Sequence, residues 1–298
     1  MNIVLTGSLG HITKPLAIKL LERDHTVTII SSDVNKQSHI QSLGAMAATG
    51  SLTDTSFLAE IFKSADVAYC MTPPDFSAPD QIAWYEKVAL SYADAIVASR
   101  IRRAIYLSSY GAHLPSGTGF ITGSYRAEKI LDALPGVLIT HIRPTFFYYN
   151  LFAFIRMIKA AGFIGAVYGG DDKLAMVSPQ DIASAVAEEM VRTDGHAKIR
   201  YVTSDDRTCN AIAQVLGTAI GKPNMKWNVL PPADVMKALL ANGMSHHAAE
   251  NLIELGLAVH SGILREDYEK HKPTLGNTRL EEFANEFADR YNQGSTQH

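Results

Sequence analysis

Residues 6–12 read TGSLGHI, where the short apolar run Ile3–Thr6 gives way to a helical pattern that carries Pro15. Gly7 permits a tight strand-to-helix turn, and Gly10 lets a backbone approach a diphosphate without a Cβ in the way. The helix N-terminus behind the loop offers unpaired N–H groups to phosphate oxygens. Pro15 fits the first helical turn, where no N–H is needed. Two glycines occur in many tight turns, but this strand–loop–helix context predicts a dinucleotide-binding loop.

Short apolar runs alternate with amphipathic stretches through the first half of the chain. The apolar runs have the length of strands and are Ile3–Thr6, Thr26–Ile30, Val67–Met71, Ala104–Leu107 and Leu138–Ile142. The amphipathic stretches between them are Lys14–Glu22, Thr55–Lys63, Ile82–Ala98 and Ser124–Ala133. Apolar runs without polar alternation are typical of strands buried on both faces. This order predicts an α/β fold with a Rossmann-type, doubly wound parallel sheet and right-handed crossovers.

Helical patterns dominate after Pro144. They cover Leu151–Ala160, Pro179–Arg192, Cys209–Ile220, Ala233–Asn242 and His246–Leu257. A strand-like run, Arg200–Val202, falls among them and is expected to return to the main sheet. We therefore predict an NAD(P)-binding Rossmann domain over residues 1–150, with a return strand near 200–202. Residues 151–298 are expected to form a smaller, mostly helical substrate-binding lobe.

The composition indicates an ordinary soluble protein. Hydrophobic residues make up 47% and charged residues 19% of the 298 residues. The net charge of −3 favours neither nucleic acid nor a membrane surface as a partner. The longest apolar candidate, Phe146–Phe154, is broken by Asn150, and the N-terminus lacks the basic region of a signal peptide. Cys70 and Cys209 belong to no CxxC pair, so the cytoplasm is the expected compartment.

The sequence lacks the motifs of several enzyme classes. It contains no G-x-S-x-G elbow, no H-E-x-x-H and no Walker loop, which argues against hydrolases, zincins and NTPases. His246 and His247 lie in a polar helical segment and are expected at the surface, and His141, inside an apolar strand, is expected to be a satisfied core histidine, so no metal site is expected. The expected partner is a small-molecule substrate, and the sequence leaves open whether the chain is a monomer or a homodimer.

The residues after the second strand decide between NAD and NADP. A carboxylate there binds the ribose 2′-hydroxyl, whereas an arginine binds a 2′-phosphate. The chain offers Ser31, Ser32 and Asp33, with Lys36 one turn later. The serines accept either cofactor, Asp33 favours NAD, and Lys36 favours NADP. The predicted cofactor is therefore NAD(P), with a slight preference for NADPH.

Two further segments are expected on the same surface. Met71, Thr72 and Pro73 end a central strand, where their backbone is expected to flank the nicotinamide. Ser51 and Leu52 follow Gly50, after a further strand expected between the runs Thr26–Ile30 and Val67–Met71, and are expected near the adenine. The full set of expected cofactor contacts is Thr6, Gly7, Leu9, Gly10, His11, Ile12, Ser31, Ser32, Lys36, Ser51, Leu52, Met71, Thr72, Pro73 and Lys129.

Five motifs, in their order along the chain, resemble the NmrA-like branch of the atypical short-chain dehydrogenases/reductases. They are TGSLGHITKPLA (6–17), CMTPPD (70–75), YLSSYGA (106–112), HIRPTFFYYN (141–150) and LEEFANEFADRY (280–291). The resemblance runs from Met1 to about Asn292 and implies a Rossmann domain with a small α/β substrate lobe.

This family contains reductases, of which the bacterial type 2 NAD(P)H:quinone oxidoreductases are the most similar, and also non-catalytic redox sensors. The resemblance implies that the dinucleotide or the pocket is contacted by Gly7, Gly10, Ile12, Met71 and Asn150. Ser31 stands where family members usually carry the arginine that binds the 2′-phosphate, which weakens the implied preference for NADP.

Residues 125–129, YRAEK, keep the tyrosine–lysine spacing of active short-chain reductases, which many NmrA-like proteins have lost. Tyr125 and Lys129 lie four apart in a helical stretch, hence on one face. An ammonium near a phenol favours the phenolate, and such a phenol donates a proton to a carbonyl oxygen as hydride reaches carbon, worth ~10²–10⁴ in rate. Ser108 and Ser109 point to opposite faces of a strand, so only one of them can hydrogen-bond the same oxygen. Ser109 is favoured because its place resembles that of the catalytic serine of the wider superfamily. The alternative is a half-buried tyrosine beside a solvated lysine.

An aromatic run surrounds Asn150. It comprises Phe146, Phe147, Tyr148, Tyr149 and Phe152, most of which are expected in the core. The expected substrate pocket contains Pro144, Phe146, Phe147 and Asn150 and suits a flat quinone or aryl carbonyl. The sequence therefore predicts an NAD(P)H-dependent oxidoreductase that reduces a quinone or carbonyl by hydride transfer. The alternatives are a non-catalytic NAD(P)-binding redox sensor acting through a partner protein, and an NAD-using lyase or epimerase.

Overall fold

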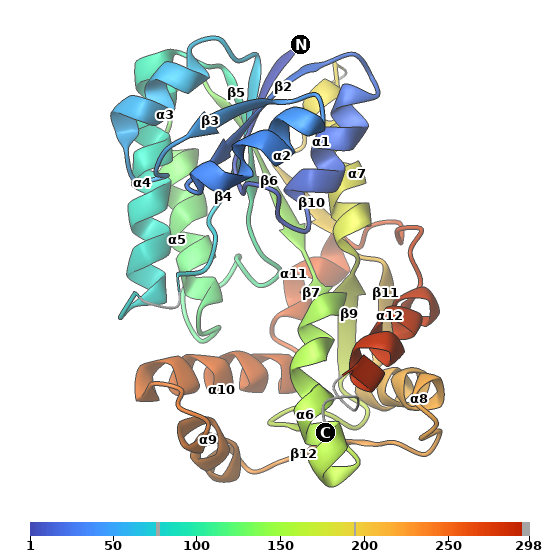
Figure 1. The fold of residues 1–298 in the computed structure, drawn as a ribbon. Helices are drawn as coiled ribbons and strands as arrows, with labels where there is room; N and C mark the ends of the chain where they lie inside the picture. The colour runs from blue at the N-terminus through green and yellow to red at the C-terminus, as the bar shows by residue number, and fades with distance from the viewer. Residues whose placement is uncertain (76–77, 194, 294–298) are drawn as a thin grey trace. The chain divides into compact units, whose positions relative to one another are not determined.

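The apolar runs of the first half form a seven-stranded sheet in the computed structural model of the chain (Figure 1). The structure describes residues 1–75, 78–193 and 195–293. The strand order is β10-β6-β5-β4-β1-β2-β3, and β1 to β6 pair in parallel. The strands are β1 (Asn2–Leu5), β2 (Thr26–Ser31), β3 (Met46–Thr49), β4 (Val67–Met71), β5 (Arg103–Leu107), β6 (Leu138–Pro144) and β10 (Ile199–Val202). The predicted Rossmann-type α/β sheet is confirmed.

Helices cover both faces of this sheet, so its central strands are apolar throughout. Val67 to Cys70 in β4 are at most 1% exposed. Figure 1 shows α3, α4 and α5 on one face and α1 on the other. The helices are α1 (Thr13–Leu21), η1 (Val34–Lys36), α2 (Gln37–Ser42), α3 (Thr55–Phe62), α4 (Gln81–Ser99), α5 (Ile121–Asp132) and α7 (Pro179–Val191). Among the helices of the described residues, none is long and apolar enough to cross a membrane.

The chain divides into two compact units. The first comprises Met1–Pro115, Ile121–Pro144 and Ile182–Tyr201. The second comprises Ser116–Phe120, Thr145–Asp181 and the chain from Val202 onward. Helix α7 begins in the second unit and continues into the first, where β10 lies beside β6 in the sheet.

Helices α4 and α5 approach closely because Gly123 has no side chain. A Cβ at Gly123 would lie 2.9 Å from Cβ of Tyr85 and 3.3 Å from Cα of Ile82. Asp80 caps the start of α4 by accepting from the backbone N–H groups of Ile82 and Ala83 at 2.8 and 3.1 Å. Helix α5, which carries the predicted tyrosine–lysine pair, therefore rests on a well-capped neighbour.

The second unit contains small sheets and helices. Its sheets have the orders β11-β9-β7 and β12-β8. The strands are β7 (Phe146–Phe147), β8 (Ile164–Ala166), β9 (Lys173–Val177), β11 (Asp205–Thr208) and β12 (Trp227–Val229). The helices are η2 (Tyr148–Phe154), α6 (Ile155–Ala161), α8 (Cys209–Ala219), α9 (Pro232–Ala241), α10 (His246–His260), α11 (Arg265–Lys270) and α12 (Leu280–Gln293). Tyr148, Phe283 and Phe287 belong to its core.

The segment Leu151–Ala160, predicted as a helix, lies partly in a 3₁₀-helix. Element η2 covers Tyr148–Phe154, and the α-helical conformation starts only at Ile155. Tyr148 and Leu151 are buried, and Phe154 packs against the same core. This spacing of three matches the three residues per turn of a 3₁₀-helix. Burial of the bulky rings therefore decides the local conformation.

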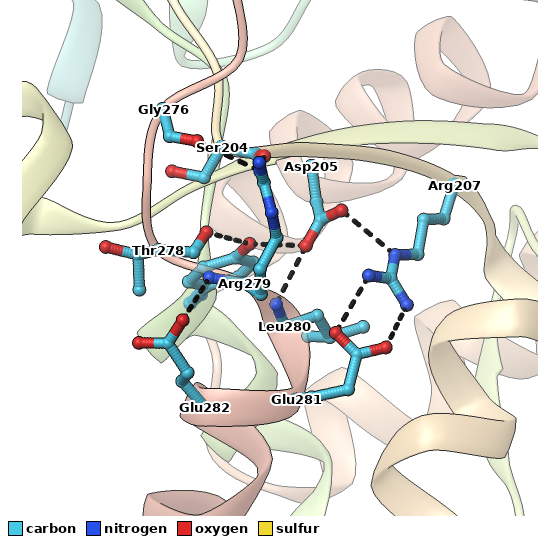
Figure 2. A network of polar contacts seen from close by, with 10 residues as sticks. Ser204, Asp205, Arg207, Gly276, Thr278, Arg279, Leu280, Glu281 and Glu282 are labelled. Carbon is cyan, nitrogen blue, oxygen red and sulfur yellow. Dashed lines mark hydrogen bonds and ion pairs between the residues drawn. The ribbon is translucent and has the colours of Figure 1, made fainter.

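One buried carboxylate joins three segments of the second unit, as Figure 2 shows. Asp205, 6% exposed, accepts from the hydroxyl of Tyr148 at 2.9 Å and from the backbone N–H of Leu280 at 2.8 Å. Nε of Arg207 donates to its second oxygen at 3.0 Å, and the same guanidinium binds both oxygens of Glu281 at 2.6 and 2.9 Å. The negative charge at the N-terminus of α12 also complements the helix dipole. Asp205 therefore links the aromatic run, β11 and α12.

Both cysteines are free and buried. Burial raises the pKa of the Cys209 thiol to about 12, and it raises the pKa of the Cys70 thiol still further. Because the thiolate is the reactive form of cysteine, both side chains are poor nucleophiles in the folded protein. They act as small apolar residues of the two cores.

A second carboxylate, Asp132 at the end of α5, is bound by two bases of the first unit. Its oxygens lie 2.8 Å from Nε2 of His141 and 3.0 Å from Nζ of Lys198. Burial alone would raise the pKa of Asp132, but the hydrogen bonds to His141 and Lys198 outweigh burial and lower the pKa to about 2. His141 is therefore a core residue as expected, but only its Nε2 is satisfied, because Nδ1 is buried without a hydrogen-bond partner among the described residues.

We predict that Asp132→Asn lowers the free energy of unfolding by about 1–2 kcal/mol at pH 7, since the carboxylate is only partly shielded from solvent. A lowered pKa stabilises the folded state above the unfolded value near 3.8, and this stabilisation is lost as the pH falls towards 2. Urea unfolding of both proteins at pH 7, 5 and 3 measures the difference, which should shrink at pH 3. The exposed Asp94→Asn is the control, and equal losses in both variants would contradict the prediction.

Candidate functional site

The candidate site lies at the carboxyl ends of β1 and β4, where the strand order reverses. The chain passes from β1 to β2 on one side and from β4 to β5 on the other. Open α/β sheets bind ligands outside the strands at such a switch point. The predicted glycine loop follows β1, and the predicted nicotinamide segment follows β4, so both predicted segments lie at this edge.

The glycine loop makes a tight turn that side chains cannot enter. Gly7 has a φ of 92°, and a Cβ there would lie 2.6 Å from Oγ1 of Thr13 and 3.1 Å from Sδ of Met71. The N–H of Gly10 donates to the carbonyl of Gly7 at 3.1 Å, and a Cβ at Gly10 would lie only 3.0 Å from that oxygen. Helix α1 then starts at Thr13 with no side-chain cap from Ile12.

Thr6 joins this loop to the segment after β4. Its hydroxyl oxygen accepts from the N–H of Met71 at 2.9 Å, and its carbonyl accepts from the hydroxyl of Thr13 at 2.8 Å. The carbonyl of Met71 accepts from the hydroxyl of Tyr92 at 2.7 Å, and the carbonyl of Pro73 accepts from Nε1 of Trp84 at 2.8 Å. The structure therefore brings Thr6, Gly7 and Met71 together and fixes them on α4.

The other predicted residues of these two segments differ in exposure. Gly10 and His11 are exposed, Leu9 and Pro73 are half-buried, and Ile12 and Thr72 are buried. Oγ1 of Thr72 lies 3.3 Å from the hydroxyl oxygen of Tyr106. Ile12 is only 7% exposed, so its side chain packs in the core.

The hydroxyl of Ser31, at the end of β2, is used inside the protein. It accepts from the hydroxyl of Ser8 at 2.9 Å and from the N–H of Asp33 at 3.1 Å. The carboxylate of Asp33 caps η1 by accepting from the N–H of Asn35 at 3.0 Å. Ser31 is buried, Ser32 is exposed, and Asp33 and Lys36 are half-buried. Ser32, Asp33 and Lys36 are therefore the more exposed of the predicted residues after β2.

The segment after β3 reaches the same edge. The N–H of Gly50 donates to the carbonyl of Ser31 at 3.0 Å. The exposed hydroxyl of Ser51 lies 2.9 Å from the hydroxyl of Thr53. Leu52 is half-buried and packs against the core beneath α3 and α4.

Tyr125 and Lys129 lie within mutual reach on α5. Tyr125 is half-buried, Lys129 is exposed, and Nζ of Lys129 lies 5.3 Å from the centre of the tyrosine ring. An ammonium over a tyrosine ring is a favourable cation–π contact. The predicted four-residue spacing therefore brings the two side chains together.

The two serines at the end of β5 have different partners. The hydroxyl of Ser108 donates to Oε1 of Glu128 at 2.5 Å, and Ser108 is 7% exposed. The hydroxyl of Ser109 donates only to the neighbouring carbonyl of Tyr110, at 3.1 Å, and Ser109 is half-buried. Ser108 therefore belongs to a buried network, which favours Ser109 as the serine of the site.

The sequence interpretation missed the partners of Ser108. Glu128 also accepts from Nε and Nη2 of Arg143 at 2.9 and 2.6 Å, and both charged residues are at most 5% exposed. The signal was in two motifs already quoted, since Glu128 lies inside YRAEK and Arg143 inside HIRP. Two opposite charges in otherwise apolar surroundings indicate a buried pair.

The predicted pocket residues fall in both units. Pro144 ends β6 in the first unit, where its carbonyl accepts from the N–H of Tyr110 at 3.0 Å. Phe146 and Phe147 form β7, which pairs with β9, and Asn150 is exposed. The rings of Phe147 and Tyr149 lie 5.0 Å apart. Tyr148 stacks on Phe283 in the core, and Phe152 contacts the same ring.

A family profile and a curated relative match this chain. The profile of the NmrA-like family matches residues 1–283. A curated relative from Streptomyces griseus subsp. griseus, a (4-alkanoyl-5-oxo-2,5-dihydrofuran-3-yl)methyl phosphate reductase, is 27% identical over 223 residues, 74% of either chain.

Solved structures share the fold. An Escherichia coli NADPH-dependent quinone oxidoreductase complexed with NADPH has a TM-score of 0.79 at 20% identity, covering 95% of this chain and 99% of the other. A Citrobacter sp. triphenylmethane reductase has a TM-score of 0.78 at 17% identity, covering 97% and 100%. A Staphylococcus aureus nucleoside-diphosphate-sugar epimerase has a TM-score of 0.79 at 18% identity, covering 96% and 100%. Because the profile of the NmrA-like family matches residues 1–283 of the 298, the chain belongs to this family.

Proposed function

We propose that this chain is an NAD(P)H-dependent reductase that passes hydride to a quinone or a carbonyl. The observation that carries the proposal is the Tyr125–Lys129 pair, whose ammonium lies 5.3 Å from the phenol ring in the unit that holds the glycine loop. Reductases of the same family and fold support it, among them the S. griseus enzyme and the E. coli NADPH-dependent quinone oxidoreductase.

The glycine loop fits a nicotinamide dinucleotide. Gly7 and Gly10 allow a turn too tight for a Cβ at either position, and the first turn of α1 has N–H groups without a side-chain cap. These groups would bind the diphosphate, the backbone of Met71–Pro73 would flank the nicotinamide, and Ser51 and Leu52 would lie near the adenine. The bound cofactor supplies the hydride.

Asp33 and Lys36 act in opposite directions on the choice of cofactor. A carboxylate at Asp33 repels a 2′-phosphate, and the ammonium of Lys36 attracts it. Because Ser31 replaces the arginine usual in the family and is bonded to Ser8, the protein binds both cofactors, with a slight preference for NADPH.

Tyr125 acts as the general acid in this proposal. Its hydroxyl gives a proton to the substrate oxygen while hydride adds to carbon, and the ammonium of Lys129 stabilises the phenolate that remains. Ser109 holds the substrate oxygen by a hydrogen bond. A redox sensor would need the glycine loop without the Tyr125–Lys129 pair. An epimerase or lyase would retain its cofactor through purification, and this outcome separates it from a reductase.

We predict that the chain binds NADH and NADPH with dissociation constants that differ by less than a hundredfold. We also predict that Gly7→Ala abolishes the binding of both cofactors. The new Cβ would collide with Thr13 and Met71. Gly44→Ala is the matched control, because Gly44 has a similar φ of 89° but no atom within 4 Å of its Cβ position. Isothermal titration with each cofactor measures the affinities. No heat with either cofactor at millimolar concentration would sink the proposal.

We predict that Tyr125→Phe lowers the turnover of a carbonyl substrate ~10²–10⁴-fold, because the ring stays and the proton donor is lost. A quinone should depend less on Tyr125, since the anion formed by hydride addition is stabilised and takes its proton from water. Stopped-flow oxidation of NADPH with an aryl aldehyde and with a quinone measures both. Tyr291→Phe is the control, because Nζ of Lys159 lies 5.0 Å from the Tyr291 ring in the second unit. Unchanged carbonyl turnover would remove Tyr125 from the mechanism.

A further inference from the structure

Helix α5 is tied to the sheet by a network of four buried side chains. Glu128 accepts from Nε of Arg143 at 2.9 Å and from Nη2 at 2.6 Å, a bidentate contact, and from the hydroxyl of Ser108 at 2.5 Å. Nη1 of Arg143 donates to the hydroxyl of Tyr201 at 3.2 Å. All four side chains belong to residues that are at most 7% exposed. The network joins the end of β5 with α5, β6 and β10.

The guanidinium of the central pair is held in its charged form. Burial lowers the pKa of the Arg143 guanidinium, but the hydrogen bonds and the charge of Glu128 outweigh burial and raise it above its ordinary value. The guanidinium also lies 5.7 Å from the centre of the Tyr201 ring. Each carboxylate oxygen of Glu128 therefore has a fixed donor.

Stability alone does not explain this pair. Removing two charges from water costs so much that a buried ion pair is often no more stabilising than apolar side chains of the same size. A bidentate guanidinium–carboxylate contact does fix a distance and a direction at once, which a packed apolar pair does not. The pair therefore specifies an orientation.

The oriented element is the helix that carries the proposed acid. At 3.6 residues per turn, Tyr125 and Lys129 lie within about 40° of one another around α5, and Glu128 lies about 60° from Tyr125. Fixing Glu128 against the sheet therefore sets the direction in which Tyr125 and Lys129 point. The same carboxylate accepts from the hydroxyl of Ser108 and so fixes the residue that precedes Ser109.

We propose that Glu128 and Arg143 are positioning residues that orient Tyr125 for the reaction. Glu128 moves no proton itself, because its oxygens are occupied by Arg143 and Ser108. The inference rests on the proposed reductase function, in which Tyr125 is the general acid. This positioning role differs from a role in folding, because the effect of Glu128 on turnover passes only through the side chain of Tyr125.

A double-mutant cycle tests this coupling. Glu128→Gln keeps the size of the side chain and removes its charge. It should lower carbonyl turnover ~10²-fold, because the proposed acid Tyr125 is misplaced. The affinity for NADPH should stay unchanged. In a Tyr125→Phe background the same change should lower turnover less than twofold. Losses that multiply would overturn the proposal. The control is Glu189→Gln, which removes the charge of a buried carboxylate that pairs with the half-buried Arg200 (3.0 Å) in the same unit, and it should leave turnover unchanged.

Two further measurements keep the test decisive. Arg143→Lys retains the charge but cannot bind both carboxylate oxygens, so it should fold and still lower turnover. In protein labelled with ¹³C at the tyrosine rings, the Tyr125 signal, identified by its loss in Tyr125→Phe, should shift in Glu128→Gln, whereas the Tyr148 signal should not. An unmoved Tyr125 signal overturns the positioning role. If the wild-type chain shows no turnover but the Tyr125 signal still shifts in Glu128→Gln, only the reductase function is refuted.

Discussion

The missing side chain at Gly7 is the constraint on which the rest of the first unit depends. At Gly7 the chain turns so tightly from β1 into α1 that a Cβ would lie 2.6 Å from Oγ1 of Thr13 and 3.1 Å from Sδ of Met71. The turn lets Thr6 bond to both Thr13 and Met71, which joins the two strands at the switch point. A residue with a side chain would separate α1 from β4 and thereby open the edge where a dinucleotide fits.

The sequence predicted the sheet because its central strands are buried on both faces and therefore read as apolar runs. The third strand, Met46–Thr49, gave no such run, since it lies at the sheet edge and its residues are half-buried or exposed. Strands of the second unit such as Phe146–Phe147 are too short to carry a period of two. In Tyr148–Phe154, tertiary burial of aromatic rings outweighed the helical pattern and gave a 3₁₀-helix.

The same contrast applies to the candidate site. Spacing along one helix predicted the approach of Lys129 to Tyr125, because four residues make about one turn. No local pattern distinguishes Ser108 from Ser109, because the distinction comes from Glu128, twenty residues away. Likewise, no local pattern indicated that the hydroxyl of Ser31 is bonded to Ser8 and Asp33. Contacts within a turn could be inferred, and contacts across the fold could not.

Residues 116–120, which precede α5 in the chain, belong to the second unit. There the N–H of Gly119 donates to Oε2 of Glu254 at 3.1 Å. Gly119 has a φ of 55°, and a Cβ would meet the carbonyl of Asn251 at 2.0 Å. The absence of a side chain at Gly119 therefore lets this segment pack on α10 within the second unit, just as the absence of one at Gly7 lets β1 turn tightly into α1 within the first.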